Sequence, residues 1–217
     1  APAGYLKALR ELATEIGSVL IFDEITSGFR MCVGGIHRNY GIYPDMAVFA
    51  KSMANGYAMS VVMGAEKVMQ SAQTTFISST NWTDRIGPAA ALATLRKYQR
   101  LGVEKHLIDT GNKVKQIWRG AGEAHGLEIN VTGLPSLAAF TLKSHNAIAL
   151  NTRFTIELLR RGFLGFRQFK PSLAHQSADL SQYQNAVDEV FALIAADPAL
   201  SIDTPLAHSG FQRLTKE

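Results

Sequence analysis

Apolar residues near the start of the chain follow a helical spacing first and then form short unbroken runs. The spacing over 5–16 predicts an amphipathic helix, and Gly17 suits the position just past its end. The runs 19–22 and 46–50 are apolar without alternation, which is typical of strands covered on both faces. A third apolar stretch occupies 60–63. This order of helix and strands predicts an α/β fold with a mostly parallel sheet.

The second half of the chain has longer helical patterns and only short apolar runs between them. We expect helices over 87–100, 103–121, 148–161 and 178–195, the last with Ser177 as N-cap. We expect strands over 127–131, 137–142 and 163–166. The change in character places a domain boundary near 100–105. Residues 1–102 are therefore predicted to be part of a larger α/β domain, and 103–217 a small α+β domain.

Composition excludes several classes of function. With 47% hydrophobic and 18% charged residues, the 217-residue chain is typical of a globular protein. Its formal charge of +4 comes from scattered Lys and Arg, so nucleic-acid binding is not expected. Six dispersed histidines and one cysteine indicate neither a metal site nor a disulfide. No apolar stretch suits a membrane span and no signal peptide is visible, so we expect a cytoplasmic protein.

Charged residues stand where two predicted strands end. Asp23 follows the run 19–22, and Lys51 follows the run 46–50. Ligands of α/β proteins bind at the carboxyl ends of parallel strands. A buried Asp or Lys is costly unless it is paired or functional. The pair therefore indicates a ligand site, although a turn-capping Asp and a surface Lys are the simpler alternatives.

Three strings around these residues carry a family resemblance: LIFDEITSGFR at 20–30, YGIYPD at 40–45 and FAKS at 49–52. In this order and separation they resemble the class III aminotransferases, which are fold-type I enzymes that use pyridoxal 5′-phosphate (PLP). The similarity is greatest to the group that contains glutamate-1-semialdehyde aminomutase. It runs almost end to end, from PAGYL at 2–6 to VDEV at 187–190.

The resemblance implies a role for four residues. Asp23 matches the carboxylate that pairs with the pyridine nitrogen of PLP and keeps it protonated. Lys51 matches the lysine that forms the internal aldimine and then moves a proton between substrate and cofactor. Ile25 matches the branched residue packed on one face of the ring, with plain core packing as the alternative. Thr80 matches the threonine that contacts the cofactor phosphate across a homodimer interface, with an ordinary turn threonine as the alternative.

The chain departs from the family pattern in three places. Thr26 stands where many members carry glutamine near the ring hydroxyl, and SMANG at 52–56 replaces the usual glycine run. The family's N-terminal half, which supplies the phosphate loop and the aromatic residue on the other ring face, is not in this sequence. Because the chain starts at Ala1 and passes directly into a helical pattern, a fragment or a processed chain is expected.

Two functional hypotheses follow. The first is a PLP-dependent aminotransferase, or a closely related aminomutase, that acts on a small-molecule amino donor and a carbonyl acceptor. The second is a truncated product or pseudoenzyme that acts only by association with another chain. The remaining candidates have ordinary interpretations: the histidines as surface or hydrogen-bonded groups, Arg30 as structural, and Cys32 as a buried apolar residue.

Overall fold

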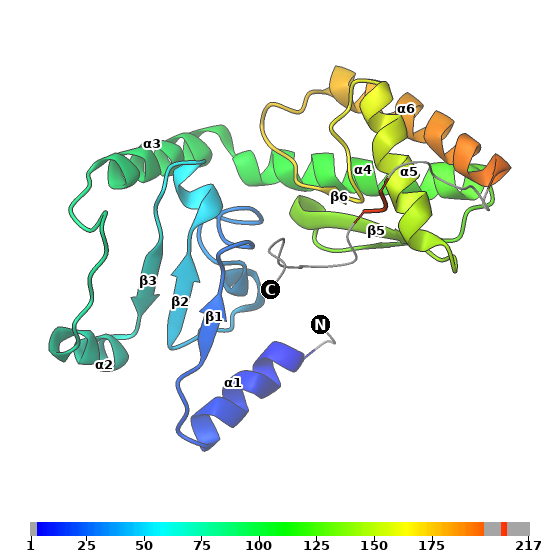
Figure 1. Cartoon of the computed structure of the whole chain (residues 1–217). Helices are drawn as coiled ribbons and strands as arrows, with labels where there is room; N and C mark the ends of the chain where they lie inside the picture. The colour runs from blue at the N-terminus through cyan, green and yellow to red at the C-terminus, as the bar shows by residue number, and fades with distance from the viewer. Residues whose placement is uncertain (1–3, 198–204, 208–217) are drawn as a thin grey trace. The chain divides into compact units, whose positions relative to one another are not determined.

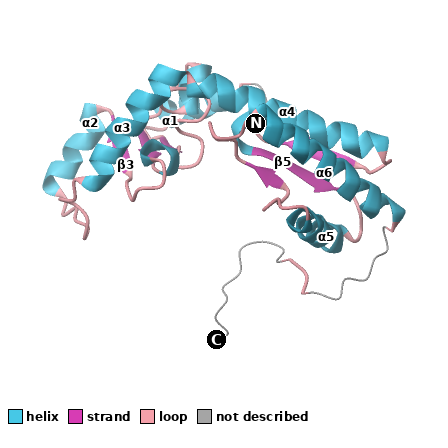
Figure 2. Ribbon diagram, turned by 90° about the horizontal axis from the view of Figure 1, so that it is seen from above, coloured by secondary structure: helices cyan, strands magenta, loops and turns pink. Residues whose placement is uncertain are grey.

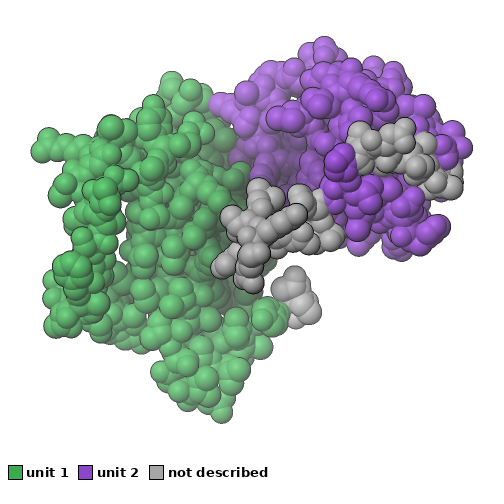
Figure 3. Space-filling view, viewed as in Figure 1, with its two compact units in different colours: residues 1–105 green, residues 106–217 purple. Residues whose placement is uncertain are grey.

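The computed structural model of the chain describes residues 4–197 and 205–207, so Pro2 and Ala3 of the resemblance lie outside the described residues. The chain divides into two units, 1–105 and 106–217 (Figure 3). Each unit has its own sheet and its own buried cluster.

The first helix of unit 1, α1, spans Tyr5–Glu15 and confirms the periodicity of its leucines. It ends as predicted at Gly17, which adopts a left-handed backbone with φ 69°. The amide of Gly17 donates to the carbonyl of Thr14, and the amide of Ser18 donates to that of Ala13. These two bonds satisfy carbonyls that the helix end leaves free, and glycine adopts the required φ without a Cβ clash.

The sheet of unit 1 has three strands in the order β1-β2-β3 (Figure 1): β1 (Ile21–Asp23), β2 (Met46–Phe49) and β3 (Val61–Gly64). As expected, β1 is parallel to β2, with Asp23 opposite Val48. The next pairing departs from the expected parallel arrangement, because β3 is antiparallel to β2. A parallel return needs a crossover of about a dozen residues or more, usually a helix, and the connection 50–60 is too short for one.

One face of this sheet is covered by a small apolar cluster. Its buried members are Ala47, Phe49, Met53, Ala54 and Ala91. The cluster is completed by α3 (Ile86–Leu101), which packs on the short 3₁₀ turn 51–54 that follows β2. The short helix α2 (Glu66–Met69) follows β3.

The two-sided coverage predicted for the first strand is wrong in the described chain. Ile21 is 53% exposed and Val19 is 50% exposed. The reason is that β1 is an edge strand, and the described residues cover only the face toward which Phe22 and Glu24 point.

Unit 2 builds an antiparallel sheet in the order β4-β5-β6 with long helices beside it. Figure 2 shows α4 and α6 running alongside β5. The elements are α4 (Val103–Ala124), β4 (Ile129–Thr132), β5 (Ala138–Leu142), α5 (Ala147–Arg160), β6 (Gln168–Phe169) and α6 (Ser177–Ala196). The predicted helices and the first two predicted strands are therefore confirmed within a few residues.

Two details of unit 2 differ from the sequence-based expectation. The strand predicted at 163–166 lies instead at Gln168–Phe169, because the backbone at Phe163 and Gly165 is used in a turn that closes the end of α5. The N-cap of α6 is Gln176 and not Ser177. Asp179 accepts a hydrogen bond from the amide of Gln176 at 2.8 Å, which forms a capping box.

The core of unit 2 is organised around Phe140 of β5, which is fully buried. Its ring lies 4.9 Å from that of Trp118 in α4, 5.0 Å from that of Phe154 in α5 and 5.7 Å from that of Phe191 in α6. A single strand residue thus contacts all three helices. The Trp118 indole donates to the hydroxyl of Tyr183 at 2.9 Å, so the buried polar atoms of this cluster are paired.

We expect Phe140→Ala to lower the free energy of unfolding by about 3–5 kcal/mol, because it leaves a cavity that borders three helices. Urea unfolding followed by circular dichroism measures the change. Leu164→Ala is the control: Leu164 is 95% exposed, and its truncation should cost no more than about 0.5 kcal/mol. Equal losses for the two variants would contradict the assignment of Phe140 to the centre of this core.

Candidate functional site

The candidate site lies where the parallel strands β1 and β2 end. Asp23 is the last residue of β1, and Lys51 lies two residues beyond the end of β2. Both side chains are exposed in the described chain, so the burial expected for them is wrong. The exposure has the same cause as that of Ile21: the described residues leave this face of the edge strand uncovered.

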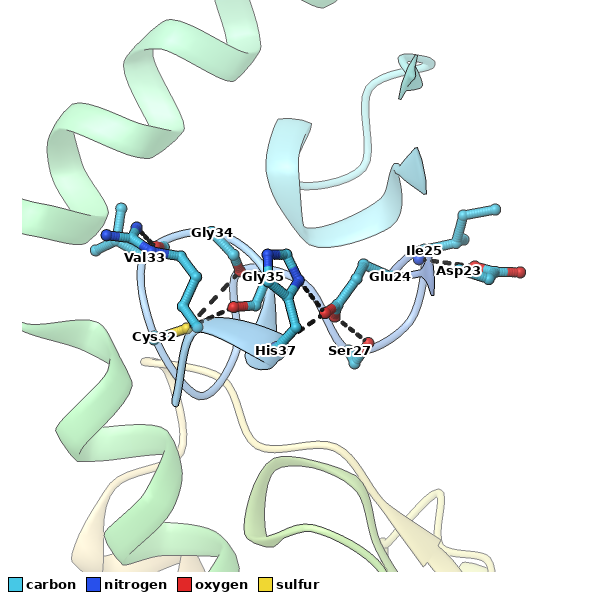
Figure 4. Close-up of polar contacts among 10 residues, drawn as sticks. Asp23, Glu24, Ile25, Ser27, Cys32, Val33, Gly34, Gly35 and His37 are labelled. Atoms are coloured by element: carbon cyan, nitrogen blue, oxygen red, sulfur yellow. Dashed lines mark hydrogen bonds and ion pairs between the residues drawn. The ribbon is translucent and has the colours of Figure 1, made fainter. Parts of the chain in front are cut away.

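Asp23 and Glu24 are neighbours in sequence but point to opposite sides (Figure 4). This follows from the alternation of side chains along an extended chain. Asp23 uses Oδ1 to accept a hydrogen bond from the amide of Ile25 at 2.9 Å, which fixes the rotation of its carboxylate. Its Oδ2 is not engaged by any of the described residues and remains available to a ligand.

Glu24 is buried, and its carboxylate holds the loop that follows β1. Oε1 accepts from the backbone amide of His37 at 3.1 Å and contacts His37 Nδ1 at 2.9 Å, while Oε2 accepts from the Ser27 hydroxyl (Figure 4). Burial opposes the ionisation of Glu24, but the hydrogen bonds from Ser27 and His37 outweigh it and hold the pKa of Glu24 below its ordinary value. Gly35 is required beside this pair, since a Cβ there would lie 2.4 Å from the His37 ring.

Lys51 has a strained backbone. Its φ of 46° lies in the left-handed region that side-chain-bearing residues rarely adopt. Such residues cost about 1–3 kcal/mol and cluster at functional sites. The Lys51 ammonium reaches back to β1 and donates a hydrogen bond from Nζ to the Thr26 hydroxyl at 2.6 Å. The structure therefore brings Lys51 together with Thr26 of the loop that follows β1.

Thr80 lies apart from this group. It is exposed in the turn that precedes α3, and no hydrogen bond among the described residues joins it to Asp23 or Lys51. Its neighbours Ser79 and Asn81 line a groove of about 520 Å³ together with the start of α3. The predicted phosphate contact of Thr80 in a second subunit therefore stays a prediction.

The minor candidates have structural roles. Arg30 donates from Nε to the carbonyl of Thr26 at 2.7 Å, which is consistent with the structural role expected for it. Cys32 was expected to be buried and apolar, but it is half-buried and its thiol donates to the carbonyl of Gly35 at 3.2 Å. Among residues 4–197 and 205–207 there is no group of three metal-ligating side chains, and no helix is long and apolar enough to cross a membrane.

The sequence profile of the family described as "Aminotransferase class-III" matches residues 1–188. The chain belongs to this family. The assignment agrees with the resemblance of the strings that carry Asp23 and Lys51. No comparison singles out the aminomutase group within the family.

The chain is similar to proteins named as an aminotransferase and a transaminase. The chain is 35% identical over 185 residues to the 3-aminobutyryl-CoA aminotransferase of Cloacimonas acidaminovorans (strain Evry), which covers 79% of this chain and 45% of that protein. It is 33% identical over 158 residues to the 2′-deamino-2′-hydroxyneamine transaminase of Streptomyces kanamyceticus, which covers 73% of this chain and 40% of that protein. The chain thus spans less than half the length of each of these relatives.

Solved structures give the fold. The FumI protein of Sphingopyxis sp. MTA144, in its PLP internal aldimine form, superposes with a TM-score of 0.84 at 25% identity and covers 90% of this chain and 48% of that one. A transaminase with PLP bound superposes with a TM-score of 0.82 at 23% identity, covering 91% and 49%. The fold is therefore that of the fold-type I PLP-dependent transaminases.

The residues at the ends of β1 and β2 fit PLP chemically. Asp23 offers a carboxylate with one oxygen held by the backbone and the other unengaged, which suits a protonated ring nitrogen. Lys51 offers an exposed primary amine just beyond the neighbouring strand. Asp23 would supply the negative charge opposite a protonated ring, and Lys51 in its neutral form the nitrogen nucleophile for the cofactor aldehyde.

Sequence reasoning missed the Glu24–His37 pair and the Thr26–Lys51 contact. The Glu24–His37 pair was overlooked because His37 has no catalytic motif around it. One signal was present: side chains alternate along a strand, so Glu24 was bound to point to the side opposite Asp23. The second joins residues 25 positions apart and depends on the path of the intervening loop. Only the departure at Thr26 from the family glutamine pointed to that position.

We expect Glu24→Gln to reduce the free energy of unfolding by about 1–3 kcal/mol at neutral pH, because a buried carboxylate with several donors is lost. Since the folded pKa of Glu24 is lowered, its stabilisation is present above the ordinary value of 4.5 and is lost as pH falls through the folded value. The difference between wild type and variant should therefore shrink progressively as the pH falls below 4.5. Urea unfolding over a pH series measures it.

Glu66→Gln is the matched control, because Glu66 is exposed in α2. It should leave both the stability and its pH dependence close to those of the wild type. A Glu24→Gln variant whose deficit is the same at every pH would contradict the proposed ionisation of Glu24.

Proposed function

We propose that this chain carries the lysine and the ring-nitrogen partner of a PLP-dependent aminotransferase. The observation that carries the proposal is the position of Lys51 and Asp23 at the ends of two adjacent parallel strands, in a chain of the class III aminotransferase family. Within the proposal, unit 1 is part of the cofactor-binding large domain, and the residues after about 102 form the small C-terminal domain.

Asp23 would bind the pyridine nitrogen through its unengaged Oδ2, while the amide of Ile25 holds Oδ1. A carboxylate beside a pyridine nitrogen favours the protonated ring. PLP, when bound, supplies an electron-withdrawing ring that accepts the electrons released when a substrate carbon loses its proton. The Ile25 side chain would pack against one face of that ring.

Lys51 would hold the cofactor through its Nζ and, when that nitrogen is free, act as the general base. In that role Nζ removes the proton from the carbon that bears the substrate amino group and later returns a proton to the cofactor side. The side chain has a stem of four carbons and reaches from the strained backbone at φ 46° to the Thr26 hydroxyl in the loop after β1.

The reaction proposed is transfer of an amino group between a small-molecule amino donor and a carbonyl acceptor. The named relatives support transfer between molecules, because the two most informative are an aminotransferase and a transaminase. Intramolecular aminomutase chemistry would use the same Lys51 and Asp23, and no observation favours it over transfer. A reducing, cytoplasmic location stays a prediction, made because the sequence shows neither a membrane span nor a signal peptide.

We further propose that the intact protein is a homodimer with the segment 75–86 at its interface. This segment exposes large apolar side chains: Phe76 is 94% exposed, Trp82 65% and Ile77 52%. Exposed apolar clusters of this kind mark interaction sites. Thr80 lies in the middle of the segment, so it would be carried to the neighbouring subunit's cofactor phosphate, as the family resemblance implies.

Incubation with PLP followed by borohydride reduction tests the function. We expect stoichiometric pyridoxyl label on the peptide that contains Lys51, and label at background level in Lys51→Ala, because that variant removes the amine that follows β2. Peptide mapping by mass spectrometry locates the label. Lys97→Ala, which removes an exposed lysine of α3, is the control and should label like the wild type.

Absence of label on Lys51 in the intact protein, or label spread evenly over many lysines, would contradict the proposed function. That result would favour the alternative in which the chain acts only through association with another polypeptide.

For the dimer, we expect the double variant Phe76→Asp/Trp82→Asp to shift the intact protein toward monomer in light-scattering measurements, because two charges would have to be desolvated at the interface. Leu164→Asp in unit 2 is the control, since Leu164 is equally exposed but lies outside the segment. A wild-type monomer, or a dimer insensitive to the double variant, would refute this interface.

A further inference from the structure

The hydroxyl of Thr26 lies in hydrogen-bond contact with the nitrogen on which the proposed function depends. The distance from Lys51 Nζ to Thr26 Oγ1 is 2.6 Å, at the short end of the range for such bonds. Thr26 is half-buried in the loop after β1, whereas the Lys51 side chain is exposed. The fixed partner is therefore the threonine, and the long lysine side chain adapts to it.

Close packing brings the two residues together. Gly28 lies against the ring of Phe49, the last residue of β2, and a Cβ on Gly28 would stand 2.6 Å from Phe49 Cδ1. Phe29, with φ 54°, packs its ring edge-on against the same Phe49 at 5.5 Å. The loop after β1 is thus pressed onto the end of β2, two residues before Lys51.

Thr26 is also restrained from its other side. Its carbonyl accepts a hydrogen bond from Arg30 Nε at 2.7 Å, and the preceding residues of the loop are held by the buried Glu24 carboxylate and its contact with His37. Backbone bonds also close the turn, since the amide of Gly28 donates to the carbonyl of Glu24 at 2.8 Å. The hydroxyl therefore has a defined position, which a group on a mobile loop would lack.

A lysine side chain loses rotamer entropy when it is confined, so an amine that must meet a reacting atom gains from being held beforehand. Lys51 has only one such restraint among the described residues, the bond to Thr26. The hydroxyl can accept a hydrogen from Nζ and still donate its own hydrogen, so it does not block the nitrogen.

We propose that Thr26 is a positioning residue, whose hydroxyl holds Lys51 Nζ at the end of β1 whenever that nitrogen is free. This inference rests on the proposed function. Held in this position, Nζ would meet the cofactor aldehyde at a higher rate than a freely rotating lysine side chain.

The test compares Thr26→Val, which keeps the shape and removes the hydroxyl, with Thr26→Ser, which keeps the hydroxyl. In the intact protein we expect the rate of pyridoxyl labelling of Lys51 by PLP and borohydride to fall about tenfold in Thr26→Val, the factor that one hydrogen bond of ordinary net strength supports. Thr26→Ser should remain within about twofold of the wild type. Peptide mapping against time gives the rates.

Reductive methylation of Lys51 by formaldehyde, a small aldehyde that needs no binding site, separates positioning from general reactivity. It should proceed at the wild-type rate in both variants, with Lys97 as the internal reference, and thermal unfolding should confirm that both variants are folded. If Thr26→Val does not fold, Thr26→Ala replaces it as the variant without a hydroxyl.

Three outcomes overturn the inference: an unchanged or faster PLP rate in Thr26→Val, an equal loss in Thr26→Ser, and a parallel loss with formaldehyde. If the wild-type protein takes no PLP label on Lys51, the proposed function itself is wrong. This result differs from the three outcomes above, because there is then no wild-type rate with which the variants can be compared.

Discussion

The parallel pairing of β1 with β2 is the constraint on which the candidate site depends. It sets Asp23 opposite Val48, and the amide of the next residue, Glu24, donates to the carbonyl of Val48 at 2.9 Å. A shift of the register by one residue would turn Asp23 inward and Glu24 outward, since side chains alternate along a strand. Glu24 holds the loop, whereas Asp23 is the carboxylate proposed to meet the ligand, and only this register allows both.

The two units differ in how far they bury their own apolar residues. In unit 2, Phe140 and the aromatic rings around it form a core that closes within residues 106–197. In unit 1 the buried cluster is small, and large side chains such as Ile21 and Trp82 remain exposed. Unit 1 is also the unit that carries Asp23 and Lys51. The site therefore belongs to the part of the chain with the largest apolar surface still available to other polypeptide.

Much of the fold could be predicted from the sequence, because helix periodicity and Gly17 are local signals. The ends of β1 and β2 were also predictable, and with them Asp23 and Lys51. What could not be predicted depends on contacts between distant residues. Glu24 and His37 are 13 positions apart, and they meet only because the loop between them turns back at a place where Gly35 leaves room. The direction of β3 was likewise decided by the length of a connection and not by its composition.

At position 51 the backbone favours one kind of residue and the proposed function requires another. A left-handed conformation is natural to glycine and is costly for a residue with a side chain, by about 1 kcal/mol or more. Selection for folding alone would therefore favour glycine or asparagine at this position, as at Asn55, which has a φ of 48° in the same turn. The presence of lysine means that the amine is retained against the preference of the backbone. Stabilising substitutions chosen by backbone geometry would start at this position, and would remove the amine that the proposed function requires.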